Sequence, residues 1–452
     1  MYSFAHRRTL LGALTLVAMS SASSSALALT PEEREARCAD IRDVAADNGI
    51  SAGFLLAGIA SAETELSHCH SELSWACEGP DSPDCGGPVV AGAGDGACSL
   101  QQGGLGMFQF DGGTFDQTIA RDGDGVLLLS GNVTRAVDFV VNMVMNSQYT
   151  DATTPEEAKA WMNDVTVDGP LWDAWIRTVT HYYNGCSPTA CSVFNQRYAH
   201  YDEHARNVFD EQGDAFWQVE IPPCSPIPPE GRAFEETDTC FTKGGPLPYW
   251  RVGIGGGNNL HVWTGTTADA ESVNYVEWDL IFDEAGQYLV EVSIPDGGST
   301  MAAYVIDHAG ATDEIIVDQS VGTEFVELGT FDFDAGDGQR IFLGDNTGEA
   351  DGRKLVADTL RFTRIDEPGG GGGGGDGNGG GPGGISVGGS GEGGAGIGGG
   401  SEGGSGSDGD DDEDDGCSVA AADGSSMTSR AGILALLAGL YLVRRRDRRR
   451  TH

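Results

Sequence analysis

Residues 55–64 of this chain read Leu55-Leu56-Ala57-Gly58-Ile59-Ala60-Ser61-Ala62-Glu63-Thr64. The run is apolar almost throughout, which predicts a buried helix, and it places a carboxylate at its C-terminal end. The negative end of a helix dipole disfavours an ionised acid, so Glu63 has the setting of a general acid. Glu65 is the rival, but two residues turn a helix by about 200°, so only one of the two can face a given cleft. Taken alone, a Glu at this place is more often just a solvated helix end.

Helical periodicity continues on both sides of this stretch. Apolar positions recur every three to four residues over residues 41–48, 51–63, 132–147 and 172–183. Ser51 and Asn132 are good N-cap residues for two of these helices. The intervening segment 69–104 is rich in Gly, Pro, Asp and Cys, which predicts a disulfide-stapled loop. We therefore expect a mainly α-helical domain over residues 29–217.

Three motifs of this domain resemble the soluble lytic transglycosylases, a family with a lysozyme-like fold. Residues 60–64 resemble the segment in which the catalytic Glu precedes a Ser, with Thr64 in place of that Ser. Residues 104–114 resemble the family's Gly-Leu-Met-Gln segment, which they match at Gly106, Gln109, Gly113 and Thr114. Residues 182–185, Tyr-Tyr-Asn-Gly, resemble its Ala-Tyr-Asn-Ala-Gly segment.

The resemblance implies that Glu63 is the single acid/base of a peptidoglycan-cleaving enzyme that needs no cofactor. It implies cleavage of the MurNAc-GlcNAc β-1,4 bond, in which the sugar's own acetamido or 6-hydroxyl group completes the displacement and leaves a 1,6-anhydromuramoyl end. Hydrolysis stays open, since Asp111 or Asp122 could hold a water. The residues expected to line the glycan cleft are Gln109, Met107, Phe108, Tyr183 and Asn184.

One role in the resemblance stays unassigned. The family has a tyrosine near the end of the domain in a Glu-Thr-x-x-Tyr-Val context, and neither Tyr198 nor Tyr201 matches that context. This departure and the Cys-rich insertion favour the alternative of a non-catalytic cell-wall or glycan-binding surface protein with a degenerate lysozyme-like domain. The retained Glu63 favours the enzyme. A matrix or adhesion protein that relies on its second domain is the third hypothesis.

A change of pattern marks the second domain. Residues 218–234 are rich in Pro, which predicts a stiff linker. From 235 to 365, short alternating segments such as 275–280, 287–292 and 340–343 are separated by Gly and Asp turns, which predicts an antiparallel β-sandwich.

The sandwich segments 285–290, 326–331 and 356–361 resemble the golvesin C-terminal-like domain. That resemblance implies a binding or spacing module, with carbohydrate as the expected partner. Trp250 and Trp263 are candidates for a sugar-stacking platform or for the core, and Trp278 is expected in the core.

Metal binding is not expected. His200, Glu203 and His204 have the order seen in inverzincins, but a third ligand is missing, so a solvated helix face is favoured. Residues 121–125 suggest a calcium loop, yet the ligand spacing fails and a solvated turn is the better interpretation.

The two ends predict export and surface attachment. Residues 1–28 combine basic residues, an apolar run and Ala-Leu-Ala, which is typical of a signal peptide. A Gly-rich and acidic stalk, expected to be disordered, covers residues 366–416, and the tail 417–452 resembles the C-terminal sorting signal of myxobacterial surface proteins. This resemblance implies a sorting peptidase as a partner and attachment at Cys417. The apolar segment 431–443 rises only about 20 Å as a helix, whereas a bilayer core is roughly 30 Å thick, so a retained transmembrane helix would need flanking residues.

The net charge and the cysteines limit the possible partners and the cellular compartment of the protein. The net charge of −43 excludes nucleic acid as a partner, because phosphate binding needs clustered Lys and Arg. Ten cysteines in an exported chain indicate disulfides, with Cys186–Cys191 and Cys224–Cys240 as plausible pairs. Setting Cys417 aside, one cysteine must then be free among Cys38, Cys69, Cys77, Cys85 and Cys98.

Overall fold

The computed structural model describes residues 28–365, except Ser74, 93–96, 99–103, Asp296, Ala350 and Asp351. All but the last residue of the expected signal peptide 1–28, the stalk 366–416 and the sorting tail with Cys417 lie outside the described residues. Within the described ranges, no helix has both the length and the apolar character needed to cross a membrane.

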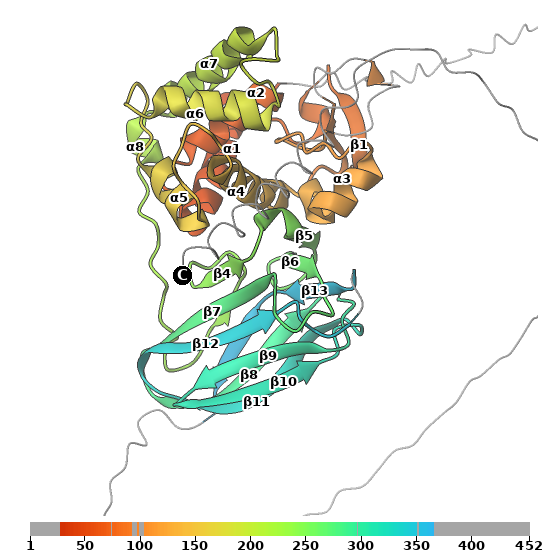
Figure 1. Ribbon diagram of the computed structural model, residues 1–452, viewed down its shortest axis with the longest axis vertical. Helices are drawn as coiled ribbons and strands as arrows, with labels where there is room; N and C mark the ends of the chain where they lie inside the picture. The colour runs from red at the N-terminus through yellow and green to blue at the C-terminus, as the bar shows by residue number, and fades with distance from the viewer. Residues whose placement is uncertain are drawn as a thin grey trace, which may run out of the picture. The chain divides into compact units, whose positions relative to one another are not determined.

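The N-terminal part of the described chain is mainly helical, as expected, and is drawn in red to yellow-green in Figure 1. That this arrangement is lysozyme-like stays a prediction. The α-helices are α1 (Pro31–Asp47), α2 (Phe54–Thr64), α3 (Phe115–Asp122), α4 (Leu129–Met145), α5 (Pro155–Asn163), α6 (Trp172–Thr178), α7 (Phe194–Gln212) and α8 (Asp214–Trp217). Short turns of other helix types are η1 (His70–Glu72), η3 (Asp124–Leu127), the π-helical η4 (Val179–Tyr183) and η5 (Leu247–Tyr249).

Helix α2 is buried along nearly its whole length, which confirms the apolar pattern of residues 55–62. It packs tightly against α7, because a Cβ at Gly58 would lie 2.7 Å from the Cβ of Ala205. The expected N-cap at Ser51 is wrong: the helix begins at Phe54 with Gly53 as its N-cap.

Helix α4 begins three residues before the expected N-cap. Its first residue is Leu129, so Asn132 lies inside the helix, fully buried. The backbone N–H of Leu129 donates instead to the Asp84 carboxylate at 2.7 Å, which is the usual chemistry of a capped helix start. The N-cap prediction for Asn132 is therefore wrong, and its side chain makes hydrogen bonds to the backbone of Phe108 and Val126 instead.

The Cys-rich insertion contains regular structure. Strands β1 (Cys77–Ser82) and β2 (Gly87–Ala91) pair as an antiparallel hairpin. The segment predicted as a loop is thus a hairpin held by two disulfides, Cys69–Cys85 and Cys77–Cys98.

The C-terminal part is an antiparallel β-sandwich, as expected (Figure 1). Its strands are β3 (Ala233–Phe234), β4 (Phe241–Gly244), β5 (Arg251–Ile254), β6 (Leu260–Gly265), β7 (Tyr275–Phe282), β8 (Gly286–Ile294), β9 (Ala302–His308), β10 (Ala311–Val317), β11 (Thr323–Phe333), β12 (Gly336–Gly344), β13 (Lys354–Ala357) and β14 (Leu360–Arg364). The sheet orders are β10-β9-β12-β7-β4, β11-β8-β14-β3 and β13-β6-β5.

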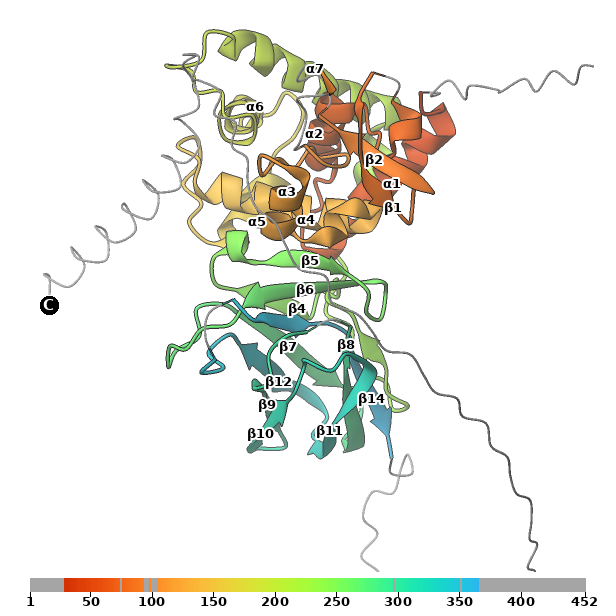
Figure 2. The same cartoon turned by 90° about the vertical axis from the view of Figure 1, so that its right-hand side faces the viewer.

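Aromatic side chains join the two larger sheets. Phe282 of β7 lies 4.5 Å from Phe333 of β11 and 4.9 Å from Tyr288 of β8, measured between ring centroids. Figure 2 shows β7, β9 and β12 on one side of the sandwich and β8, β11 and β14 on the other. Alternating strand residues therefore supply a common core, as in other sandwiches.

The proline-rich linker is attached to the sandwich. Ile227 is fully buried and its N–H donates to the carbonyl of Ile281 at 2.6 Å. The Cys224–Cys240 disulfide adds a covalent tie.

Helix α4 also contacts strand β4. Lys243 of β4 donates to both carboxylate oxygens of Asp138 in α4 at 2.7 Å.

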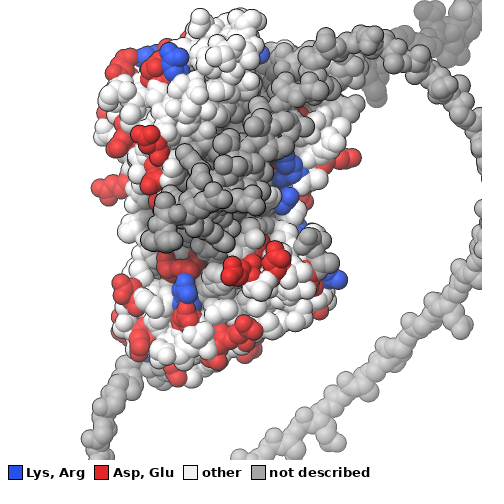
Figure 3. Space-filling view, viewed as in Figure 1, with Lys and Arg blue, Asp and Glu red and all other residues white. Residues whose placement is uncertain are grey.

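Acidic side chains dominate the charged surface. On the face drawn in Figure 3, Asp and Glu are spread over both the helical part and the sandwich, with few Lys and Arg among them. This distribution agrees with the net charge of −43.

Candidate active site in the helical part

Glu63 lies in the last turn of α2, and its half-buried carboxylate meets a side chain from α7. The hydroxyl of Tyr201 donates a hydrogen bond to Oε1 of Glu63. Nδ2 of Asn184 donates in turn to the Tyr201 hydroxyl at 3.3 Å. Three residues from separate parts of the chain thus form one hydrogen-bonded row.

Tyr201 is the one of the two tyrosines left open by the sequence whose hydroxyl reaches Glu63. The hydroxyl contact with Glu63 singles it out from Tyr198, whose hydroxyl donates to Asp173 instead. Because the match fails in the surrounding sequence, the signal in the sequence was too weak to separate the two. Only the helical face of α7 that packs on α2 decides between them.

Glu65, the rival carboxylate, points elsewhere. It is the exposed C-cap of α2 with a left-handed φ of 56°, and its carbonyl accepts a hydrogen bond from Arg34. The two carboxylates therefore have different surroundings, because α2 ends at Thr64 and the left-handed backbone at Glu65 turns the chain out of the helix.

Residues 104–110, here called the site loop, are fixed by side chains from three directions. The Thr64 hydroxyl donates to the Met107 carbonyl at 3.0 Å, and the Tyr183 hydroxyl donates to the Phe108 carbonyl at 2.5 Å. The N–H of Phe108 donates to Oδ1 of Asn132 at 3.0 Å. Thr64 directly follows Glu63, so the loop and the carboxylate are positioned by the same helix end.

The backbone of the site loop needs glycine. Gly106 has a φ of 69°, and a Cβ there would lie 2.3 Å from Nδ2 of Asn132. Gln109 has a φ of 51° and its Nε2 donates to the Gly106 carbonyl at 2.7 Å. The loop is therefore a tight turn held against α4.

The expected cleft residues divide into two groups. Gln109, Tyr183 and Asn184 are half-buried, and Tyr183 and Asn184 hold the loop and Tyr201. Met107 and Phe108 are fully buried, so their side chains belong to the core and only their carbonyls take part in the hydrogen bonds of the site. This corrects the expectation that both side chains line a cleft.

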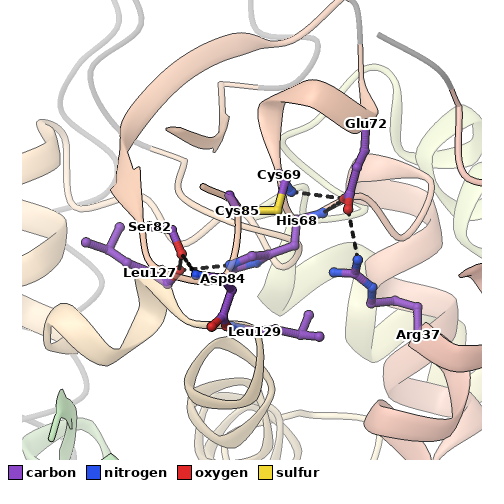
Figure 4. Close-up of a disulfide and its surroundings, with 9 residues drawn as sticks. All are labelled: Arg37, His68, Cys69, Glu72, Ser82, Asp84, Cys85, Leu127 and Leu129. Atoms are coloured by element: carbon purple, nitrogen blue, oxygen red, sulfur yellow. Dashed lines mark hydrogen bonds and ion pairs between the residues drawn. A yellow bond between two sulfur atoms is a disulfide. The ribbon is translucent and has the colours of Figure 1, made fainter. Parts of the chain in front are cut away.

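The disulfide-stapled hairpin supports the site loop. Gly106 donates to the Val90 carbonyl at 2.9 Å, and Gly92 donates to the Gly104 carbonyl at 3.0 Å. Figure 4 shows the base of this insertion, where the Ser82 hydroxyl and Nε2 of His68 both point to the Leu127 carbonyl beside the Cys69–Cys85 disulfide. The insertion thus extends the loop's backbone pairing.

The tyrosines near Glu63 act as neutral hydroxyl donors. Burial, and then the charge of Glu63, raises the pKa of Tyr201 well above its ordinary value of 10. Burial and the same carboxylate also raise the pKa of Tyr183. Both hydroxyls therefore keep their protons at neutral pH.

Asp111 and Asp122, the two carboxylates expected as candidates for holding a water, have different surroundings. Asp122 is fully buried and pairs with Arg121 at 2.6 Å and with Arg135 at 3.0 Å, so it is not free to hold a water. It is also not part of a solvated turn, which corrects that expectation for residues 121–125. Asp111 is exposed.

The histidine pair on α7 contacts α2. His200 has its Nε2 2.9 Å from the Ala62 carbonyl, and His204 has its Nδ1 2.9 Å from the Ser61 hydroxyl. Both rings are half-buried and Glu203 between them is exposed, so this helix face is partly packed on α2 and partly solvated. Their ring nitrogens are used for packing α7 on α2.

Two of the three tryptophans of the sandwich belong to the core, and Trp263, which is half-buried, stays a candidate for sugar stacking. Trp250 and Trp278 are 1% and 0% exposed and belong to the core. The ring of Trp263 has the Arg251 guanidinium 4.7 Å and the Lys354 ammonium 5.2 Å from its centroid. A groove of about 570 Å³ on the sandwich is lined by other residues, among them Glu324, Phe325 and Arg361.

The cysteine pairs Cys186–Cys191 and Cys224–Cys240 are confirmed. The expected free cysteine is Cys38, which is buried in α1. Four disulfides within the described ranges indicate folding in an oxidising compartment outside the cytoplasm.

Comparison with known proteins bears on the sandwich. Residues 256–364 match the family described as the Golvesin C-terminal domain, inside the range 235–365 expected from sequence. No curated protein sequence matches the chain. The sandwich is thus similar to a golvesin C-terminal domain, and this match covers less than half of the chain.

Three solved structures to which part of the chain is similar are named as carbohydrate-active enzymes or a carbohydrate-binding module. Paenibacillus xanthan lyase is 19% identical with a TM-score of 0.27, covering 30% of this chain and 13% of that chain. The GH26-CBM35 β-(1,4)-mannanase of Podospora anserina is 18% identical with a TM-score of 0.22, covering 31% and 28%. The C-terminal CBM6 of LamC from Zobellia galactanivorans is 19% identical with a TM-score of 0.18, covering 27% and 99%. The chain therefore spans less than a third of the first two proteins.

Proposed function

We propose that the helical part is a peptidoglycan lytic transglycosylase that cuts the MurNAc-GlcNAc β-1,4 bond. The observation that carries this proposal is the hydrogen-bonded row from Asn184 through Tyr201 to Glu63, beside a site loop fixed by Thr64 and Tyr183. A general acid needs a fixed direction toward the bond that it protonates, and this row supplies it.

In the proposed reaction, Glu63 gives its proton to the glycosidic oxygen as the bond to C1 of MurNAc breaks. The resulting carboxylate then takes the proton of the 6-hydroxyl of the same sugar, whose oxygen bonds to C1. The products are a free GlcNAc 4-hydroxyl and a 1,6-anhydromuramoyl end, so atoms and charge balance without water. Tyr201 holds the carboxyl group in place through both steps.

The surroundings of Asp122 support this route over hydrolysis. A hydrolytic enzyme of the usual kind needs a second carboxylate as nucleophile or as base for water. Asp122 is buried and held by Arg121 and Arg135, which removes one of the two candidates considered for that role.

The sandwich is proposed to bind glycan and to hold the enzyme near its substrate. Its likeness to the golvesin C-terminal domain and the groove beside Phe325 and Arg361 support a binding role. The acidic, disulfide-bonded chain is proposed to be exported and attached at the cell surface through its C-terminal tail.

The test compares the full chain with two variants, Glu63→Gln and Glu65→Gln, on purified peptidoglycan, with released fragments identified by mass spectrometry. We expect anhydromuropeptides from the wild type and from Glu65→Gln, because that side chain is exposed at the helix cap. In Glu63→Gln, we expect release to fall by at least about 100-fold, the usual contribution of a general acid.

Other outcomes select the alternatives. Reducing-end products that depend on Glu63 would make the chain a hydrolase. Binding to peptidoglycan with no Glu63-dependent release would overturn the enzyme and support the non-catalytic glycan-binding protein.

A further inference from the structure

Three carboxylates come together at one end of the sandwich, far in sequence from Glu63. Glu235 and Glu236 directly follow strand β3, and Asp358 lies between β13 and β14. One oxygen from each lies within 4.8 Å of the others. Such a gathering of like charges is unfavourable unless something compensates it.

The buried members of this cluster have unused oxygens. Glu236 is 5% exposed, and neither of its carboxylate oxygens has a partner at hydrogen-bond geometry, although the Asn258 side chain lies near enough to lower its pKa slightly against the effect of burial. Asp358 is fully buried and its Oδ2 is unpartnered. Along the part of the chain that the structure describes, no Lys or Arg pairs with any of the three.

Backbone atoms of neighbouring segments lie close to the three carboxylates. Gly256 has a φ of 107°, and a Cβ there would lie 2.5 and 2.6 Å from the two oxygens of Asp358 and 2.6 Å from the Leu260 carbonyl. The Thr359 hydroxyl donates to Oε2 of Glu235 at 2.5 Å and so orients that carboxylate. The cluster is therefore a built cradle of oxygens, with space that a side chain at position 256 would fill.

We propose that Glu235, Glu236 and Asp358 bind a divalent cation, and that this cation is Ca²⁺. The donors are all oxygens, which excludes the soft metals that prefer sulfur or imidazole. Calcium accepts an irregular set of carboxylate and carbonyl oxygens at 2.3–2.6 Å, whereas Mg²⁺ demands near-ideal octahedral geometry at about 2.1 Å. The separation of up to 4.8 Å between donor atoms suits the larger ion.

The cation would join segments that are distant in sequence. Glu235 and Glu236 follow the short edge strand β3, whereas Asp358 precedes β14, to which β3 is paired by two residues. Glu235, Gly256, Gly257 and Thr359 also line the 570 Å³ groove. Calcium therefore secures the start of the sandwich and one wall of this groove.

The ionisation of the ion-free cluster agrees with this proposal. Burial raises the pKa of Glu236 to about 8 and that of Asp358 to about 6. Both shifts have burial as their main cause, which disfavours the charged carboxylates, and a bound divalent cation would supply the compensating charge.

The experiment uses the full secreted chain, treated with EDTA and then exchanged into buffer at pH 8. Thermal unfolding is followed with CaCl₂, with MgCl₂ and without metal, for the wild type, Glu236→Gln and the control Glu314→Gln. Glu314 is an exposed residue of β10 in the opposite sheet. We expect calcium at about one hundred times its Kd to raise the Tm of the wild type and of Glu314→Gln by about 5 °C or more.

For Glu236→Gln, we expect little calcium shift and a metal-free Tm at least equal to that of the wild type, because the neutral amide removes the repulsion. The acidic run 408–415 also attracts calcium, but it is identical in all variants, so the difference between them reports the cluster. If Glu236→Gln does not fold, Asp358→Asn replaces it.

Three results would overturn the proposal or part of it. A wild-type chain whose Tm does not respond to calcium lacks the site, and an equal calcium shift in Glu236→Gln would place the ion elsewhere. A response to magnesium alone would overturn the assignment of calcium.

Discussion

At the residue scale, the candidate site depends on side chains that reach Glu63 from other elements. Tyr201 comes from α7, Asn184 follows the π-helical turn η4, and the site loop is held by Thr64, Tyr183 and Asn132. A π-helical turn is rare and frequently occurs at functional sites. Here it places the hydroxyl of Tyr183 on the Phe108 carbonyl and Asn184 on Tyr201.

Tyr201→Phe tests the row directly. The substitution removes one hydroxyl that donates to Glu63 and keeps the ring in place. Since a hydrogen bond to a charged group contributes about 1.5–3 kcal/mol, we expect peptidoglycan cleavage to slow by about 10- to 100-fold. Tyr198→Phe on the same helix is the control, and equal losses in both variants would contradict a specific role of Tyr201.

His68 gives the site a pH-dependent stability. It is fully buried behind the site loop, and burial lowers its pKa from 6.5 to about 4. As the pH falls from about 6.5 to about 4, the unfolded chain takes up a proton that the folded chain does not bind, so the free energy of unfolding decreases.

We expect urea denaturation to show this loss in the wild type and a smaller pH dependence in His68→Gln. The same substitution at the partly exposed His70 is the control. An unchanged pH dependence in His68→Gln would show that other groups cause the acid sensitivity.

At the element scale, the hairpin β1–β2 is the part that sequence interpretation understated. Its strand β2 pairs with the site loop, and Asp84 in its turn accepts a hydrogen bond from the first residue of α4. In the sequence, this insertion favoured the non-catalytic alternative, because its structure was not known. In this chain, the insertion stabilises the loop that carries Gln109.

Removing a disulfide of the hairpin is expected to lower the free energy of unfolding more than removing a disulfide that closes a shorter loop. Cys69–Cys85 closes a loop with a sequence separation of 16, whereas Cys186–Cys191 closes one of 5. Chain entropy then predicts a destabilisation of about 3 kcal/mol for the double Ser variant of the first pair and about 2 kcal/mol for the second.

Denaturant unfolding of both double variants measures this difference, and peptidoglycan cleavage measures its effect on the site. We expect a larger loss of activity for Cys69→Ser/Cys85→Ser, because that pair anchors the hairpin beside the site loop. Full activity in this variant would show that backbone pairing alone is sufficient.

At the scale of the whole molecule, helices and sandwich carry separate proposed tasks. The helical part contains the candidate acid and the sandwich contains the groove and the carboxylate cluster. Sequence patterns alone predicted this division, because a period of 3.6 residues changes to an alternation of two near the Pro-rich segment.

The free cysteine Cys38 gives a test of how α1 packs in the folded protein. Cys38 is unpaired and fully buried, and burial raises the pKa of its thiol to about 12. A thiol that stays protonated reacts slowly, so we expect iodoacetamide to leave Cys38 unmodified in the native protein and to label it in urea without reductant. Peptide mass mapping reads the result, and native labelling of Cys38 would contradict the structure of α1.

The sequence by itself determined the helical part, the sandwich and two disulfide pairs, because these depend on local periodicity and spacing. The choice of Glu63 as the acid stays a prediction. The sequence failed at Ser51 and Asn132, since a good capping residue is used as a cap only where the helix begins. Asn132 lies inside α4 and binds the site loop instead.

Tertiary structure alone decided which residues meet. Tyr201 is 138 positions from Glu63, and Glu236 is separated from Asp358 by more than a hundred residues. Such contacts depend on how α2 packs on α7 and on which strands pair, and neither leaves a periodic signal in the chain. The same reason explains why Met107 and Phe108 were expected in the cleft, although packing places their side chains in the core.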